Sequence, residues 1–333
     1  MIGQAAIAST PKDTVLVDGG ASLYRFRAGS SGARTGSYPV LLVPSMINRW
    51  YVMDLRPKVS LAAALVDAEL DTWLLDWGIP RDEDRYRTWD ESVERIARMV
   101  RRVKRETGAP KVVVLGYCMG ATISAVYAAL HADELAGFIN LAGPIDFSHA
   151  GLLGALVDRA HFDPEAMTAA GNLPASMMQT GFEALRPTSA ISKWVSLADR
   201  GLDPSFRDAF GALDTWASDN IPFPGACYVT YIEELYQDNR LALGEHRVRG
   251  RAVELGEIDC PLLTITASRD HICPPAAATA LNALVGSANT EVFEVPGGHV
   301  GAVVGSRAPK MLHPKIVSWI HEHTQKEETD AAA

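Results

Sequence analysis

Short apolar runs alternate with amphipathic stretches along most of the chain. The apolar runs are rich in β-branched residues and predict strands at Thr14–Asp18, Leu23–Arg27, Val40–Val43, Thr72–Asp76, Val112–Leu115, Gly137–Leu141, Leu262–Thr266 and Glu291–Val295. Most of these runs are apolar enough to be buried on both faces of a sheet. The alternation therefore predicts an α/β fold, with a mostly parallel sheet and helices on both of its faces.

The most complete helix signal lies between Asp84 and Gly108. Thr88 followed by Glu91 is typical of a helix start, and Gly108 followed by Pro110 is typical of a helix end. Helical patterns also follow the last two strands, at Ala276–Leu284 and Lys310–His323. The end of the chain, 326–333, is polar and predicts a flexible tail.

One long interval, 146–259, interrupts the alternation. It contains helical fragments rich in aromatic residues and methionine, including NLPASMMQTGF, SAISKWVSL and FPGACYVTYIEELYQ. We interpret the interval as a lid inserted into a core formed by 1–145 and 260–325, although such residues also pack ordinary cores. An aromatic-rich lid suits an apolar acyl substrate.

Composition narrows the class of protein. The chain has 333 residues and a formal charge of −9, which argues against a nucleic-acid partner. Its one dense basic run, Arg98–Arg105, shares a helix with apolar positions and predicts a solvated face. The sequence has neither a signal-peptide pattern nor an apolar stretch long enough to span a membrane, so we expect a cytoplasmic protein.

The four cysteines, Cys118, Cys227, Cys260 and Cys273, show neither metal-binding nor disulfide spacing. We therefore expect no metal site, and we expect the last three cysteines to be buried thiols. Cys118 differs from them because it lies in Gly116-Tyr117-Cys118-Met119-Gly120, between a predicted strand and a predicted helix.

That segment has the form of a nucleophile elbow with cysteine in place of serine. The sharp turn requires small residues two positions before and after the nucleophile, here Gly116 and Gly120. Unpaired N–H groups at a helix start favour the Cys118 thiolate, and the Met119 N–H can stabilise an oxyanion. The motif predicts covalent acyl transfer.

A thiol nucleophile needs a base, and the base needs a carboxylate that orients it. Asp270 follows one late predicted strand and His299 follows the next, so the order Cys118, Asp270, His299 is that of the α/β-hydrolase triad. We considered His271 as an alternative base and Asp146 as an alternative acid, and we favour His299 and Asp270. The loop after Val40–Val43 should supply the second oxyanion donor, with Met46 preferred over Ser45.

The chain resembles the polyhydroxyalkanoate synthases from about Val40 to Ala308. The resemblance rests on PSMINRWYVMDL at 44–55, DTWLLDWG at 71–78, LGYCMGAT at 115–122, VELGEIDCPLLTITASRDHICPP at 253–275 and PGGHVG at 296–301. It implies an α/β-hydrolase fold and an acyltransferase that polymerises 3-hydroxyacyl groups from coenzyme A thioesters, with no cofactor. It also implies Cys118 as the acylated thiol, His299 as its base, and Asp270 as the carboxylate serving His299 or the incoming hydroxyl.

Two features depart from the family pattern. The synthase elbow usually has a second glycine where this chain has Ala121. The chain also lacks the extra N-terminal domain of the long synthases and resembles the short catalytic subunits, which work with a separate partner subunit. The resemblance thus implies a possible second subunit, a homodimer and a place on the surface of polyester granules. A thioesterase or polyester hydrolase with the same triad remains the alternative.

Overall fold

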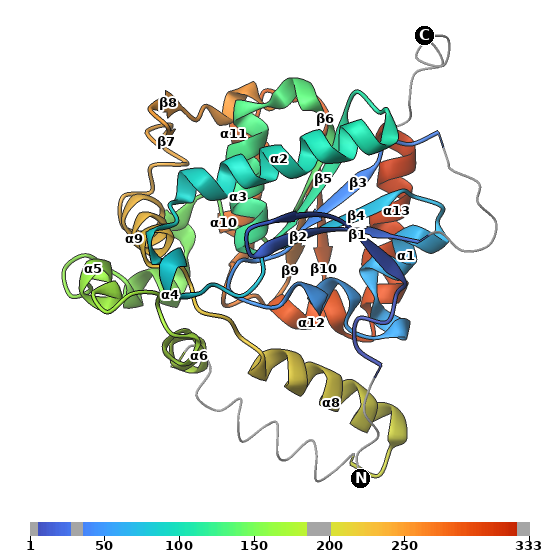
Figure 1. Cartoon of the computed structure of the whole chain (residues 1–333), viewed down its shortest axis with the longest axis horizontal. Coiled ribbons are helices and arrows are strands. Elements are labelled where there is room, and N and C mark those ends of the chain that lie inside the picture. Colours follow the sequence, from blue (N-terminus) through green and yellow to red (C-terminus); the bar gives the residue numbers. More distant parts are fainter. Residues whose placement is uncertain (1–5, 28–35, 185–200, 325–333) are drawn as a thin grey trace.

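The computed structural model describes residues 6–27, 36–184 and 201–324. Its centre is an eight-stranded sheet in the order β1-β2-β4-β3-β5-β6-β9-β10 (Figure 1). The strands are β1 (Lys12–Asp18), β2 (Ala21–Phe26), β3 (Val40–Val43), β4 (Thr72–Asp76), β5 (Val112–Tyr117), β6 (Leu135–Leu141), β9 (Leu262–Ala267) and β10 (Thr290–Val295). Strand β2 alone runs in the direction opposite to the other seven. All eight strands predicted from the sequence are confirmed, with ends that differ by at most two residues.

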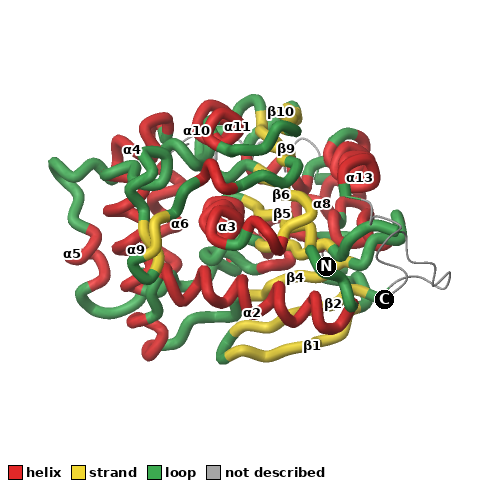
Figure 2. Tube along the Cα trace, turned by 90° about the horizontal axis from the view of Figure 1, so that it is seen from above, coloured by secondary structure: helices red, strands yellow, loops and turns green. Residues whose placement is uncertain are grey.

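Alternating side chains of the central strands enter two separate cores. Leu41 and Val43 of β3 pack with α2 (Trp89–Thr107) and α3 (Met119–Leu130), whereas Val40 and Leu42 pack with α1 (Leu61–Asp67) and α13 (Leu312–His323). Figure 2 shows α2 and α3 on one side of the strands and α13 on the other. Both faces of the sheet are therefore covered, as the continuous apolar runs indicate.

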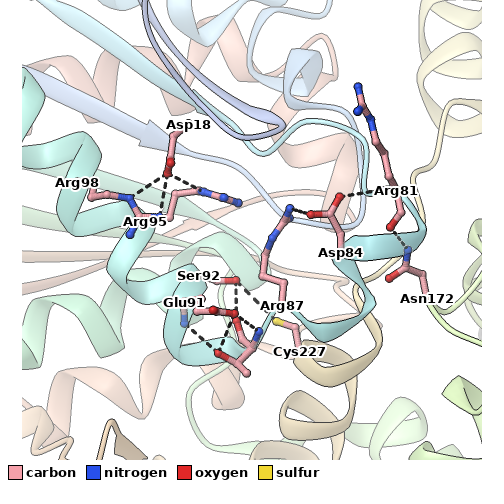
Figure 3. Close-up of polar contacts among 11 residues, drawn as sticks. Asp18, Arg81, Asp84, Arg87, Glu91, Ser92, Arg95, Arg98, Asn172 and Cys227 are labelled. Atoms are coloured by element: carbon pink, nitrogen blue, oxygen red, sulfur yellow. Dashed lines mark hydrogen bonds and ion pairs between the residues drawn. The ribbon is translucent and has the colours of Figure 1, made fainter.

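Helix α2 begins and ends as the sequence predicts. Thr88 and Glu91 form a reciprocal capping box, and Gly108 ends the helix in the left-handed conformation. Arg95 and Arg98 then bind the Asp18 carboxylate, which fastens the β1–β2 hairpin to the helix (Figure 3).

The interval 146–259 connects β6 to β9, which pair directly in the sheet. Where the structure describes this interval, its α-helices are α4 (Gly151–Leu156), α5 (Pro164–Thr168), α6 (Ala175–Ala184), α8 (Pro204–Ser218) and α9 (Gly225–Thr230), and a π-helix (Tyr231–Gln237) follows α9. Helices α4, α5, α6 and α9 gather at one side of the molecule, and α8 lies apart along another edge (Figure 1). A small hairpin with strands of two residues each, β7 (Arg247–Val248) and β8 (Arg251–Ala252), follows the π-helix in the chain. This hairpin was not predicted from the sequence.

Hydrogen bonds attach this interval to the core at several points. The Asn172 side chain donates to the Arg81 carbonyl at 2.7 Å, and Ser92 of α2 lies 4.0 Å from the Cys227 thiol (Figure 3). Within the interval, Leu173 and Phe223 exchange backbone bonds of 2.9 Å. The division of the chain into core and lid stays a prediction.

The predicted helix at Ala276–Leu284 is present as two short helices, α10 (Pro275–Thr279) and α11 (Leu281–Leu284). Between the two helices the Ala283 N–H donates to the carbonyl of Ala280, which is three residues earlier in the chain. This hydrogen bond is of the 3-10 type and interrupts the α-helical pattern. The predicted helix at Lys310–His323 begins at Leu312 instead. The fragment SAISKWVSL (189–197) and the predicted tail 326–333 lie outside the described residues. Within the described ranges, no helix is long and apolar enough to cross a membrane.

Candidate active site

The predicted elbow joins the end of β5 to the start of α3, and Cys118 is its turning residue. The Cys118 N–H donates to the Leu141 carbonyl of β6 at 2.9 Å, while the Cys118 carbonyl accepts the first bond of α3, from Ala121 at 2.8 Å. Cys118 has a φ of 56° and a ψ of −132°. A residue with a Cβ in this region carries strain of about 1–3 kcal/mol. The Cys118 side chain at this strained turn is partly exposed.

The two glycines of the elbow are needed because the backbone packs closely on both sides of the turn. A Cβ on Gly116 would lie 2.3 Å from the Ala121 Cα, and a Cβ on Gly120 would lie 2.2 Å from the Val43 carbonyl oxygen. Both distances are far shorter than a carbon atom allows, so side chains at these positions would force the elbow apart.

The methyl group of Ala121, where the synthase pattern has glycine, is accommodated by a glycine elsewhere. A Cβ on Gly143, in the loop after β6, would lie 2.3 Å from the Ala121 Cβ. The Ala121 side chain therefore fills space that Gly143 leaves open, and the elbow keeps its geometry.

His299 and Asp270 meet as the sequence predicts. The His299 Nδ1 lies 2.7 Å from Asp270 Oδ2, and both side chains are buried. Asp270 Oδ1 accepts the backbone N–H groups of Ile272 and Cys273, each at 2.9 Å, so the carboxylate is held from both sides. This arrangement fixes which nitrogen of the ring carries the proton toward Asp270.

The loops that carry this pair are joined to each other. The Arg269 N–H donates to the Gly297 carbonyl at 2.8 Å, and the Gly297 N–H donates to the Ser268 hydroxyl at 3.2 Å. His299 itself begins α12 (His299–Val304). The ends of β9 and β10 therefore form one structural unit that positions acid and base together.

The electrostatics of the site favour a charged histidine. Burial lowers the pKa of His299, but the negative charge of Cys118 and the interactions with Asp270 outweigh burial and raise it from near 6.5 to about 10. The Nε2 atom is buried and has no oxygen or nitrogen partner among the described residues. At neutral pH the His299 ring therefore carries both protons and is positively charged beside the Cys118 side chain.

Tyr117 is a residue of this site that sequence reasoning did not identify. Its ring stacks on His299 with centroids 5.3 Å apart and an angle of 25° between the planes. Tyr117 is buried, so the stack limits rotation of the imidazole. Its place directly before Cys118 was visible in the sequence, but only the fold reveals that its ring reaches His299.

The two alternatives weighed from the sequence are placed elsewhere. His271 is exposed to solvent. Asp146 accepts hydrogen bonds from Ser148 and Asn239, and so caps the short turn that opens the inserted interval. Among the described residues, neither side chain forms a hydrogen bond or ion pair with Asp270 or His299.

The predicted oxyanion donors border the elbow. Met119 is the first residue of α3, so its N–H has no acceptor within the helix. The loop after β3 contacts the elbow at Gly120, and the Trp77 indole holds that loop by donating to the Pro44 carbonyl at 2.8 Å. Met46 lies buried in this loop. The roles of Met119 and Met46, and of Ser45 as second choice, stay predictions.

The other three cysteines are buried and free. Burial raises the pKa of the Cys227 and Cys260 thiols to about 12, and it also raises the pKa of Cys273. These thiols are therefore poor nucleophiles. Among the described residues, no group of three or more histidine, cysteine or acidic side chains could hold a metal ion.

Known proteins that are similar to this chain share its fold and the family that its motifs resemble. A family model described as the alpha/beta hydrolase fold matches residues 38–306. The chain is 33% identical to the poly(3-hydroxyalkanoate) polymerase subunit PhaC of Haloferax mediterranei, over 97% of this chain and 66% of that protein. It is 32% identical to the protein of the same name from Allochromatium vinosum, over 94% of this chain and 89% of that protein.

Solved structures are similar in fold. The structure of Est1E from Butyrivibrio proteoclasticus matches with a TM-score of 0.57 and 14% identity, over 94% of this chain and 99% of that one. At this identity the similarity concerns the fold alone.

Proposed function

The chain belongs to the family of poly(3-hydroxyalkanoate) polymerases with the alpha/beta hydrolase fold, and we propose that it joins 3-hydroxyacyl groups from coenzyme A thioesters through a thioester on Cys118. The observation that carries the proposal is that the strained Cys118 elbow lies beside the buried His299, whose Nδ1 is 2.7 Å from Asp270 Oδ2. No cofactor is needed, because the coenzyme A thioester is the substrate.

The reaction proceeds in two transfers. The Cys118 thiolate attacks the thioester carbonyl, the N–H groups of Met119 and Met46 stabilise the oxyanion, and coenzyme A leaves with a proton from His299. The hydroxyl of a second monomer or of the growing chain then attacks the acyl-enzyme and gives its proton to His299. The ester bond forms and the Cys118 thiolate returns.

Cysteine suits this reaction for an energetic reason. The acyl-enzyme is itself a thioester, so the first transfer exchanges one thioester for another of similar energy. The second transfer forms a more stable ester and must outrun hydrolysis, which requires a site that excludes water. The cavity beside Cys118 has a mostly apolar lining.

The alternative reading, a thioesterase or polyester hydrolase, predicts water as the acceptor. Comparing 3-hydroxybutyryl-CoA with butyryl-CoA separates the two, because only a polymerase needs the hydroxyl group. We expect sustained release of coenzyme A and a chloroform-soluble polyester from the hydroxylated substrate, and at most slow release from the other. Equal turnover of both, with free acids as the products, would refute the polymerase.

We also propose that the protein works as a homodimer with a second subunit, at the surface of polyester granules. The relatives are named as subunits, which supports a second subunit and a homodimer, and an insoluble product supports a place on the granule surface. Sedimentation of the purified chain should show a dimer once substrate is added. A strict monomer with full activity and no lag would contradict both the dimer and the need for a partner.

A further inference from the structure

A cavity of about 360 Å³ opens directly beside the thiol. Cys118 and Met119 form its catalytic end, together with Ile47 from the loop after β3. The remaining wall comes mainly from the inserted interval, including Phe162 of the α4–α5 connection and Leu173 before α6. A group attached to the Cys118 sulfur can therefore extend into a space whose wall comes mainly from the inserted interval.

The lining of this cavity carries no charged side chain among the described residues. Tyr231 and Tyr236, which contribute two of its few polar groups, hydrogen bond to each other and have rings 5.3 Å apart. A polyester segment placed there would bring a carbonyl every few bonds, with few donors to meet it, and unpaired buried carbonyls are unfavourable. A saturated alkyl chain needs no donor. The lining thus suits a hydrocarbon rather than the polymer backbone.

The volume indicates the length of that hydrocarbon. If a methylene takes up roughly the 30 Å³ that a water molecule occupies, the cavity has room for about a dozen such groups. A 3-hydroxybutyryl group has only a methyl branch beyond its hydroxyl carbon and would leave most of the space unfilled. An unfilled apolar cavity forgoes the packing that a longer chain would gain.

We propose that this cavity binds the alkyl branch of the acyl group, and that the enzyme prefers 3-hydroxyacyl groups of six or more carbons over the four-carbon group. This inference rests on the proposed function, because a preference for the alkyl branch matters only if the enzyme uses 3-hydroxyacyl groups. The preference itself acts in the first step, the acylation of Cys118. Each added methylene that becomes buried should favour acylation up to about fourfold, until the cavity is full.

Three methionines make the cavity adaptable within that range. Met167, Met177 and Met178 all line it, and unbranched thioether side chains repack around ligands of different shape. We therefore expect a broad optimum rather than a single permitted length.

Gly181 of α6 offers a direct test. It lines the cavity, and a Cβ built on it meets no atom of the described residues within 4 Å. Gly181→Phe should fold, because it replaces glycine in a helix with a better helix former and places the ring in open space. The matched control is Ser176→Phe, which alters an exposed position of the same helix outside the cavity.

The measurement uses butyryl-CoA and octanoyl-CoA, which acylate Cys118 but lack the hydroxyl needed for extension. Intact-mass spectrometry after a short exposure to an equimolar mixture gives the ratio of the two acyl-enzymes. We expect the octanoyl form to exceed the butyryl form at least about tenfold in the wild type and in Ser176→Phe, and the ratio to fall at least about tenfold in Gly181→Phe.

A wild type that favours butyryl, or a ratio unchanged by Gly181→Phe, would overturn the proposal. If Gly181→Phe does not fold, a series of acyl-CoA substrates from about four to sixteen carbons on the wild type decides the question, since the extent of acylation must rise with length and then level off once the cavity is full. Acylation of Cys118 comes before the acceptor is chosen, so the two proposals can fail separately. Release of free acids would refute the polymerase activity, while the ratio of octanoyl-enzyme to butyryl-enzyme would still test the role of the cavity.

Discussion

Cys118→Ala is expected to lower the release of coenzyme A from 3-hydroxyacyl-CoA at least about 10⁴-fold, because removal of a covalent nucleophile eliminates the acyl-enzyme itself. A thiol-reactive dye measures the release, and mass spectrometry finds the acyl group on Cys118 in the wild type. Cys260→Ala is the control: its thiol is buried and outside the cavity, and the variant should keep wild-type activity.

The same position allows a check that the alanine variant folds. Alanine retains the Cβ and hence the strained φ of 56°, whereas glycine adopts that conformation freely. Cys118→Gly should therefore have a free energy of unfolding about 1–2 kcal/mol above that of Cys118→Ala in urea titrations, while remaining equally inactive. An acyl group found on Cys227, Cys260 or Cys273, or substantial activity in either variant, would contradict the assignment of the nucleophile.

The parts of the structure predicted well from the sequence are those with local causes. The capping residues of α2, Thr88 and Gly108, act within one turn of their own helix ends. The strand Val40–Val43 is apolar at every position because both faces of the sheet are covered, so its pattern survives without knowledge of its neighbours. The pairing of Asp270 with His299 followed from chain order because the loops after adjacent parallel strands lie at one edge of the sheet.

The parts that could not be predicted depend on contacts between distant segments. Nothing near Ala121 indicates that Gly143 makes room for its methyl group. The β7–β8 hairpin has strands of two residues and an Arg249-Gly250 turn with both φ values positive, which is a weak signal without asparagine or aspartate. The cavity beside Cys118 arises from packing of the inserted interval, and composition alone indicated only that its lining would be apolar.

The second large effect is expected in the pH dependence of Cys118 alkylation by iodoacetamide. The pKa of His299 is raised to about 10, so the imidazolium keeps its charge below that pH and stabilises the thiolate. Alkylation of the wild type should therefore change little between about pH 6.5 and 9. Loss of the imidazolium charge above about pH 10 ends the stabilisation.

In His299→Ala the thiolate has no cationic partner. The alkylation rate at about pH 6.5 should fall at least tenfold and then rise about tenfold per pH unit, as for an ordinary thiol. Asp270→Asn should lie between the two, because it removes the carboxylate that helps to raise the pKa of His299 while the ring remains. Asp270→Asn should also lower the rate of the second transfer more than the rate of Cys118 acylation, if Asp270 mainly serves the incoming hydroxyl.

His271→Ala, an exposed change one residue from Asp270, is the matched control and should keep the flat wild-type profile. The ion pair would be wrong if the wild type and His299→Ala gave parallel, steeply rising profiles, since the thiol would then be unaffected by the histidine. A flat profile that persists in His299→Ala would assign the stabilisation of the thiolate to the start of α3 instead, through the unpaired N–H groups that follow Cys118.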